Sequence, residues 1–176
     1  LNIDSSYAAG KNRIINSDFS VNQWQIADNT FLSVMNSITW DRWMFNTGSP
    51  DTGIVYWSST GTSGVSIPNI DYIPRYMNIG TYLGSISAAT YMYQRIENCW
   101  TLAGGQATCS AWVNAASGSV IKMSLKQSFG TGGTATPVTV SGTATCATSG
   151  WQRVSVTLTL PSVAGKTIGT DSYLEF

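Results

Sequence analysis

Apolar and polar residues alternate along two segments of this chain, and the alternation constrains the fold more than any other feature. In segment 151–160, valine and leucine occupy every second position from Val154 onward, with arginine, serine or threonine between them. In segment 120–129 the same period separates a largely apolar set, which includes Gln127, from lysine and serine. A period of two puts alternate side chains on opposite faces of a β-strand, and one buried face is typical of antiparallel sheets. Both segments are therefore predicted to be strands of an antiparallel sheet.

Short strands and turn sequences are predicted along most of the remaining chain. Glycine-rich turns such as Gly104-Gly105 and segment 130–133 separate them, and no ten-residue stretch has helical apolar spacing. Many short strands with regular turns indicate an all-β fold, an antiparallel β-sandwich. The connections at 25–37 and 80–90 are too long for hairpins and favour crossovers between sheets, as in a jelly roll. The other expected strands are 12–16, 40–46, 53–58, 72–79, 89–99, 106–114, 137–147 (as two short strands) and 172–176.

The composition of the chain limits the classes of partner that it is expected to bind. The 176 residues carry no net charge, and only 10% of them are charged, against about 25% in an average protein. Serine and threonine together make up about a quarter of the chain and must supply much of its surface. Nucleic acid and anionic membranes need a basic patch, so neither is expected as the main partner. No apolar run approaches the roughly 20 residues of a membrane span, so no membrane insertion is expected.

Catalysis is not expected. The chain has no histidine, which excludes Ser-His-Asp and Cys-His nucleophiles and every histidine-ligated metal site. A glycosidase needs two carboxyl groups about 5–9.5 Å apart across a cleft, and no such pair is evident in the sequence. Asp41 beside Arg42, and Arg95 two residues before Glu97, are interpreted as structural ion pairs or strand hydrogen bonds. The sequence therefore predicts a protein that is not an enzyme.

A single domain is expected over residues 11–176, after a flexible lead-in at 1–10. The last four residues resemble the middle of a strand, which suggests a piece of a longer polypeptide, incomplete at its C-terminal end. If the chain turns tightly at Gly104-Gly105, Cys99 and Cys109 lie nearly opposite each other on paired strands and could form a disulfide in an oxidising setting. The alternative is two small buried thiols.

Aromatic residues on polar strand faces are the candidate binding residues. Sugars present flat apolar C–H faces that stack on aromatic rings, while polar side chains bind the hydroxyl groups. On strand 106–114, Trp112 shares a polar face with Asn114, and a hairpin at Gly104-Gly105 would bring it beside Tyr93 or Arg95. The alternative is that Trp112 lies in the core, as is expected for Trp24, Trp40, Trp43 and Trp151. The candidate glycan platform comprises Tyr91, Tyr93, Arg95, Trp112 and Asn114, with Trp57 beside a polar loop as a second candidate or a subunit contact.

Seven short motifs follow one another from residue 11 onward. They are KNRIINSDF at 11–19 with Gln23-Trp24 after it, WDRW at 40–43, QRIE at 94–97, TLAG at 101–104, QSFGTGG at 127–133, WQR at 151–153 and LPSVAGKT at 160–167. The first resembles the opening of jelly rolls that are similar to carbohydrate-binding modules. The whole series resembles a jelly-roll domain of bacteriophage tail fibres and related virion proteins. It departs from that family at Ser17 and Gly105, where glycine and lysine are common, and in lacking the C-terminal strand that normally follows.

The resemblance implies a non-catalytic adhesion domain on the virion, in a tail fibre or a head appendage, that binds host surface glycans. It also implies a homotrimer and attachment to other virion proteins. The alternative is a structural trimerisation or attachment module of a phage fibre with no glycan site of its own. A third hypothesis is a binding module of a secreted glycosidase. Sandwiches of this kind often hold a structural calcium ion, for which Asp18 and Asp171 are the candidate ligands, with hydrogen bonding to turns as their alternative role. No other cofactor is expected.

Overall fold

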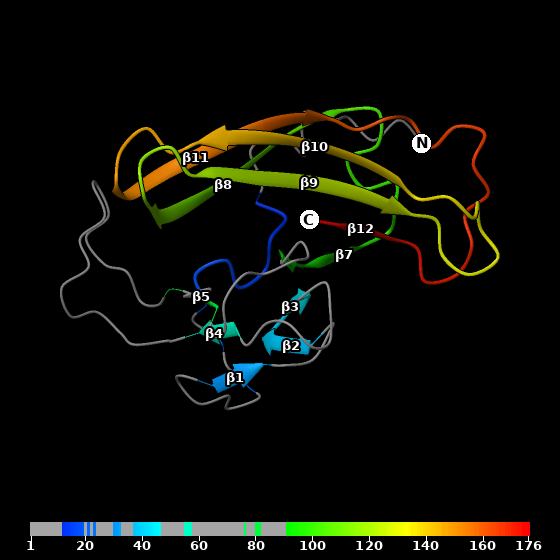
Figure 1. The fold of residues 1–176 in the computed structure, drawn as a ribbon. Helices are drawn as coiled ribbons and strands as arrows, with labels where there is room; N and C mark the ends of the chain where they lie inside the picture. The colour runs from blue at the N-terminus through cyan, green and yellow to red at the C-terminus, as the bar shows by residue number, and fades with distance from the viewer. Residues whose placement is uncertain are drawn as a thin grey trace.

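The computed structural model shown in Figure 1 is built of short and long β-strands, and every strand pairing in it is antiparallel. The described residues are 12–19, 21, 23, 30–32, 37–46, 55–57, 76, 80–81 and 91–176, without the side chains of 30–32, 37–40, 55–57 and 80–81. The strands are β1 (Thr30–Leu32), β2 (Ser37–Trp40), β3 (Trp43–Asn46), β4 (Val55–Trp57), β5 (Gly80–Thr81), β6 (Tyr91–Tyr93), β7 (Arg95–Glu97), β8 (Gln106–Ala115), β9 (Val120–Ser128), β10 (Val138–Thr145), β11 (Gly150–Thr159) and β12 (Tyr173–Glu175).

Two sheets of long strands pack face to face, as in a β-sandwich (Figure 1). One has the strand order β10-β9-β12-β7, and the other is the pair β11-β8. Met123 of β9, Leu174 of β12 and Val154 of β11 belong to the buried cluster between the two sheets. Gly142 of β10 lies so close to the second sheet that a Cβ there would be 2.5 Å from a methyl carbon of Val156. The expected all-β, antiparallel class is therefore confirmed.

The alternation predicted from the sequence matches the burial of the side chains in β9 and β11. In β9, Met123, Leu125 and Gln127 are buried while the residues between them are more exposed. In β11, Val154 and Leu158 are buried, and the arginine, serine and threonines between them face solvent. These two strands supply four of the eight buried residues in the cluster between the two layers: Met123, Leu125, Val154 and Leu158.

Several predicted strands differ from those observed. Segment 12–16 is not a strand but the beginning of a turn, in which Asn16 adopts a left-handed conformation (φ 53°) that asparagine tolerates. Segment 40–46 is a hairpin, because the chain reverses at Asp41 and Arg42 between β2 and β3. Segment 137–147 forms one strand rather than two, and 89–99 is divided at Gln94.

The last of these differences has a structural cause. Gln94 is 1% exposed, and its side-chain amide donates to the Ile15 carbonyl and accepts from the Ile15 N–H, both at 2.8 Å. The Trp43 indole donates to the Asn16 carbonyl at 2.9 Å, and the Asn16 side chain donates to the Asp41 carbonyl at 3.0 Å. Three of the sequence motifs, those at 11–19, 40–43 and 94–97, therefore meet at one junction.

Some expectations fall outside the described part of the chain. These are the lead-in at 1–10, most of the connections at 25–37 and 80–90, Trp24, the side chain of Trp40, and the strand 72–79 apart from Tyr76, which is not in a strand. Trp43 is 4% exposed, so the prediction of a core role is confirmed for it. No helix among the described residues is long and apolar enough to span a bilayer.

The predicted hairpin between 89–99 and 106–114 is wrong. At the Gly104-Gly105 turn, the Gly104 N–H donates to the Leu160 carbonyl (3.1 Å), and the Leu160 N–H donates to the Gly105 carbonyl (2.9 Å). The turn therefore carries the chain from one sheet to the other, to the end of β11. Cys99 and Cys109 are both buried and free, which is the thiol alternative rather than the disulfide.

Candidate functional site

The members of the predicted platform lie on three different sheets: Tyr91 and Tyr93 on β6, Arg95 on β7, and Trp112 and Asn114 on β8. β8 pairs with β11 along its whole length, and Trp112 is opposite Arg153. β7 pairs with β12, and β6 pairs with β3, so neither touches β8 through strand hydrogen bonds. The expected contact of Trp112 with Tyr93 or Arg95 is therefore wrong, because β8 lies in a different sheet from β6 and β7 and pairs with β11 instead.

Trp112 does face outward on β8, as the alternation predicted. Ala107, Cys109 and Ala111, on the other face, pack into or against the core cluster. Asn114 is exposed on the Trp112 side, whereas the Trp112 ring is half-buried. The neighbouring polar groups are partly engaged, since the Arg153 guanidinium donates to the Ser110 hydroxyl at 2.9 Å.

The candidate Trp57 ends β4, opposite Thr30 of β1. Its side chain lies outside the described residues. Its predicted role as a glycan contact or a subunit contact therefore stays a prediction.

The other half of the predicted platform lies in a cluster that joins β6 to the outer face of β7 and β12. We call it the tyrosine–arginine cluster: Tyr91, Tyr93, Arg95, Tyr173 and Glu175. The rings of Tyr91 and Tyr93 lie 5.7 Å apart, and the Arg95 guanidinium lies 4.3 Å from the centre of the Tyr173 ring. Tyr93 is buried, and burial raises its pKa above the ordinary value, although the nearby Arg95 charge acts in the opposite direction. The aromatic rings and the guanidinium group of this cluster therefore already contact one another.

Arg95 pairs with Glu175 rather than with Glu97, so the predicted Arg95–Glu97 pair is wrong. The distance from Arg95 Nε to Glu175 Oε2 is 3.3 Å, and Lys126 Nζ lies 3.3 Å from Glu175 Oε1. Glu175 is directly opposite Arg95 on β12, and directly opposed residues on adjacent strands come closer than residues two apart on one strand. Asp41 is structural as expected, since its carboxylate accepts the Gln23 N–H at 2.5 Å.

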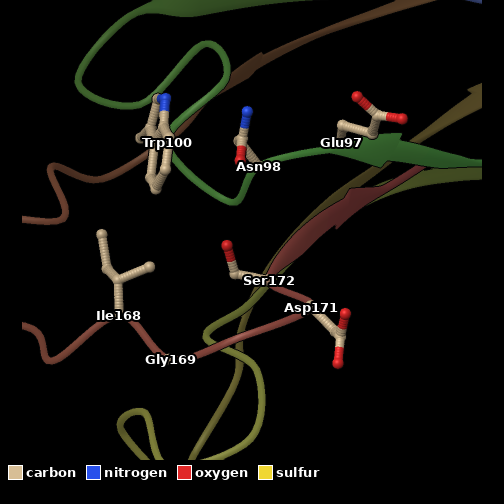
Figure 2. Close-up of a pocket in the computed structure, with 7 residues that line it drawn as sticks. All are labelled: Glu97, Asn98, Trp100, Ile168, Gly169, Asp171 and Ser172. Carbon is tan, nitrogen blue, oxygen red and sulfur yellow. The ribbon is translucent and has the colours of Figure 1, made fainter.

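An open hollow lies beside this cluster, where β7 ends and β12 begins (Figure 2). We call it the Trp100 hollow. Its volume is about 570 Å³, and the side chains of Trp100 and Ile168 on its wall are 49% and 36% exposed. In Figure 2, Trp100 and Ile168 lie on one side and the two carboxylates on the other, with the Ser172 hydroxyl between them. The lining residues are Glu97, Asn98, Trp100, Ile168, Gly169, Asp171 and Ser172.

One wall of the hollow is the turn that follows β7. Asn98 adopts a left-handed conformation (φ 68°), and its N–H donates to the Ser172 carbonyl at 3.1 Å. The Thr101 hydroxyl donates to the Glu97 carbonyl at 2.9 Å, and the Thr101 N–H donates to the Asn98 carbonyl at 3.1 Å. The turn is therefore held by its own hydrogen bonds and leaves the Trp100 ring in solvent.

The opposite wall is the segment before β12, which is held against the glycine-rich turn at 130–133. Thr131 and Thr170 exchange backbone hydrogen bonds of 2.8 and 3.1 Å, and the Gly169 N–H donates to the Phe129 carbonyl at 2.8 Å. A Cβ at Gly130 would overlap the Thr170 carbonyl oxygen, so only glycine allows this approach. The glycine-rich motif is a turn, as predicted, and it also positions one wall of the hollow.

The hollow combines an apolar surface with an amide, a hydroxyl and two carboxylates. Such a surface can stack against the apolar face of a ligand while the polar groups bind its hydroxyl or amino groups. Of the two calcium candidates, Asp171 lines the hollow and Asp18 is on the N-terminal turn. The described residues contain no group of three or more cysteine, aspartate or glutamate side chains that could hold a metal ion.

Sequence reasoning missed Trp100, Ile168 and Ser172. Trp100 lies in a turn outside any alternating segment, so strand periodicity says nothing about its orientation. A tryptophan directly before the Thr101-Leu102-Ala103-Gly104 motif is nevertheless a signal, because a large ring in a turn has no strand face to bury it. The approach of Ile168 and Ser172 to this ring depends on β7–β12 pairing, which the sequence does not reveal.

Comparisons with known proteins supply no relative. No family model matches this chain, and no curated protein and no solved structure shows significant similarity to it.

Proposed function

We propose that this chain is a non-catalytic adhesion domain that binds host surface glycans through the Trp100 hollow. The observation that carries the proposal is the exposed Trp100 ring beside Ile168, facing a set of polar side chains across an open hollow. Of the four tryptophans whose side chains are described, Trp100 alone is exposed. An exposed ring costs free energy in water, and stacking on a sugar face removes that cost.

We propose further that the domain is a jelly roll of a virion appendage, assembled as a homotrimer with other virion proteins. This part rests on the motif series that resembles phage fibre domains. Its structural support is the junction at Gln94, Ile15 and Trp43, where three of those motifs meet through hydrogen bonds. Motifs that lie far apart in the sequence thus form one structural unit.

The exposure of the two carboxylates supports binding rather than hydrolysis. Glu97 and Asp171 are both exposed, whereas the acid catalyst of a typical glycosidase is enclosed in an apolar site. Shallow sites of this kind bind weakly, with a dissociation constant of about 1 mM, or ~4 kcal/mol. Three copies on one fibre would raise the avidity about 100-fold or more.

A glycan array of the wild-type chain and the Trp100→Ala variant tests the proposal, with the mass of the same samples measured in solution. We expect a trimer that binds a defined set of glycans, and a loss of at least about tenfold in Trp100→Ala, since stacking on one ring contributes about 1 kcal/mol or more. An unchanged melting temperature of the variant separates the loss of binding from a loss of fold.

The alternative function is the structural trimerisation or attachment module. A trimer that binds no glycan on the array would contradict the adhesion proposal and favour this alternative. The sandwich offers surfaces for subunit contacts, since β10 is an edge strand of its sheet among the described strands and Val120 is 61% exposed. Binding that survives Trp100→Ala would keep the adhesion function but move it away from the hollow.

A further inference from the structure

The ionisable groups that line the Trp100 hollow are all acidic. They are the carboxylates of Glu97 and Asp171, and no lysine or arginine is among the lining residues. Neither carboxylate takes part in a hydrogen bond or an ion pair with any described residue. The chain as a whole has no net charge, so this local excess of negative charge is a property of the hollow.

Two basic residues close in sequence to the lining residues have contacts of their own. Arg95, two residues before Glu97 on β7, lies over the Tyr173 ring at 4.3 Å and pairs with Glu175 at 3.3 Å. Lys166, on the segment that leads to Ile168, lies over the Phe129 ring at 5.8 Å. Neither is therefore placed to neutralise Glu97 and Asp171 unless it gives up these contacts.

The acidic groups lie on one side of the hollow, and the apolar groups on the other. Figure 2 shows Trp100 and Ile168 together, across from Glu97 and Asp171, whose carboxylates both point away from the centre in this view. A ligand that fits this arrangement has an apolar face for the ring and a positive charge for the carboxylates. A sugar with a free, protonated amino group has both features, and an N-acetylated sugar lacks the charge.

We propose that the Trp100 hollow selects glycans that carry free amino groups over their N-acetylated or neutral counterparts. The inference rests on the proposed glycan-binding function and names the substrate class of that same site. The ammonium group gains charge-assisted hydrogen bonds from the carboxylates and attraction to the Trp100 ring, which an acetamide does not gain. Because all these groups are exposed, the preference should weaken as salt is added.

The test compares two probes that differ only in acetylation, the trimer of glucosamine and the trimer of N-acetylglucosamine. Binding is measured by calorimetry at slightly acidic pH, where the amines of the glucosamine trimer are protonated. The proteins are the wild-type chain, Glu97→Gln, Asp171→Asn and the double variant, with Asp18→Asn as a control that removes the same charge elsewhere. Thermal unfolding confirms that each variant is folded.

We expect the wild type to bind the glucosamine trimer at least about tenfold more tightly than its acetylated counterpart. Each single variant should reduce glucosamine binding about threefold to fivefold, and the double variant should abolish the preference. Asp18→Asn should leave both affinities unchanged.

Three results would overturn the inference, and they separate it from the function on which it rests. Equal binding of both trimers, with both lost in Trp100→Ala, would reject the amino-group preference and keep the glycan site. A preference that persists in the double variant would assign it to another surface. Binding of neither trimer, while the array shows a neutral glycan bound, would reject the preference alone; no glycan binding at all would reject both.

Discussion

The tyrosine–arginine cluster and the Trp100 hollow are neighbours along β7 and β12, yet they differ in whether their charged groups are paired. In the cluster, Arg95 contacts the Tyr173 ring and pairs with Glu175, and Glu175 also pairs with Lys126. In the hollow, the Trp100 ring is half-exposed and the carboxylates have no described partner. The same residue types therefore stabilise the sheet in one place and remain available to a ligand in the other.

Aromatic and charged residues on an outer strand face therefore do not by themselves make a binding site. What distinguishes the hollow is that its two carboxylates have no hydrogen bond or ion pair with any residue that the structure describes. Glu175 shows the other case, because its side chain is only 10% exposed and accepts from two cations. Variants of the two regions should therefore differ in whether they change the stability of the domain or its binding.

The largest expected effect concerns the turn that positions one wall of the hollow. Gly130 and Gly132 share a φ of 77°, but a Cβ at Gly130 would overlap Thr170 and lie 2.8 Å from the Ser172 nitrogen, whereas one at Gly132 meets nothing within 4 Å. Gly132→Ala should lower the free energy of unfolding by about 1 kcal/mol, the cost of a left-handed alanine. Gly130→Ala should cost about 3 kcal/mol or more, because backbone must move. Urea denaturation measures both, and equal losses would contradict the close packing of this wall.

The next largest effect concerns the contribution of two carboxylates to stability: Glu175, which is paired, and Glu97, which has no described partner. Glu175→Gln removes the charge that Arg95 and Lys126 share and should lower the free energy of unfolding by about 1 kcal/mol, since both cations are partly exposed and regain water. Glu97→Gln removes an exposed, unpaired charge and should change it by less than about 0.5 kcal/mol. Chemical denaturation of the two variants compares them directly. A larger loss for Glu97→Gln would mean that the hollow is the structural region.

The smallest expected effect is a pH dependence of the free energy of unfolding that arises from Tyr93 in the tyrosine–arginine cluster. Burial raises the pKa of Tyr93 above its ordinary value of 10.0, and the Arg95 charge opposes this increase. The unfolded chain therefore releases this proton first, so the free energy of unfolding falls as the pH rises above about 10 and stops falling at the folded pKa. Tyr93→Phe should lose this part of the decrease in urea denaturation on either side of that pH. An identical decrease in the variant would show that the Tyr93 phenol is not perturbed by folding.

The sequence predicted the strands better than their partners. The alternation in β9 and β11 identified which residues are buried, because a two-residue period is a local property of the strand. The pairing of β8 was wrong, because the Gly104-Gly105 turn has the composition of a hairpin but bonds to Leu160 instead. That choice depends on residues more than fifty positions away, which local patterns do not report.

The candidate site was predicted in part for the same reason. Tyr91, Tyr93 and Arg95 were predicted as neighbours and do contact one another, yet the ion pair and the closest ring contact of Arg95 come from β12, at the far end of the chain. Asp171 was singled out as a candidate calcium ligand by resemblance, and its place on the wall of the hollow was not predicted. Trp100 was missed because a residue in a turn has no periodicity from which its exposure follows.

The central claim is that ligand contact occurs at the Trp100 hollow rather than at the Trp112 face. Nitrogen-15 labelling of the tryptophans gives one indole N–H signal per ring, and Trp100→Phe and Trp112→Phe assign the two signals of interest. A titration with the glycan that binds best should shift the Trp100 signal and leave the Trp112 signal in place. A shift of the Trp112 signal with the Trp100 signal unmoved would contradict the account and place the site on the opposite face of the sandwich.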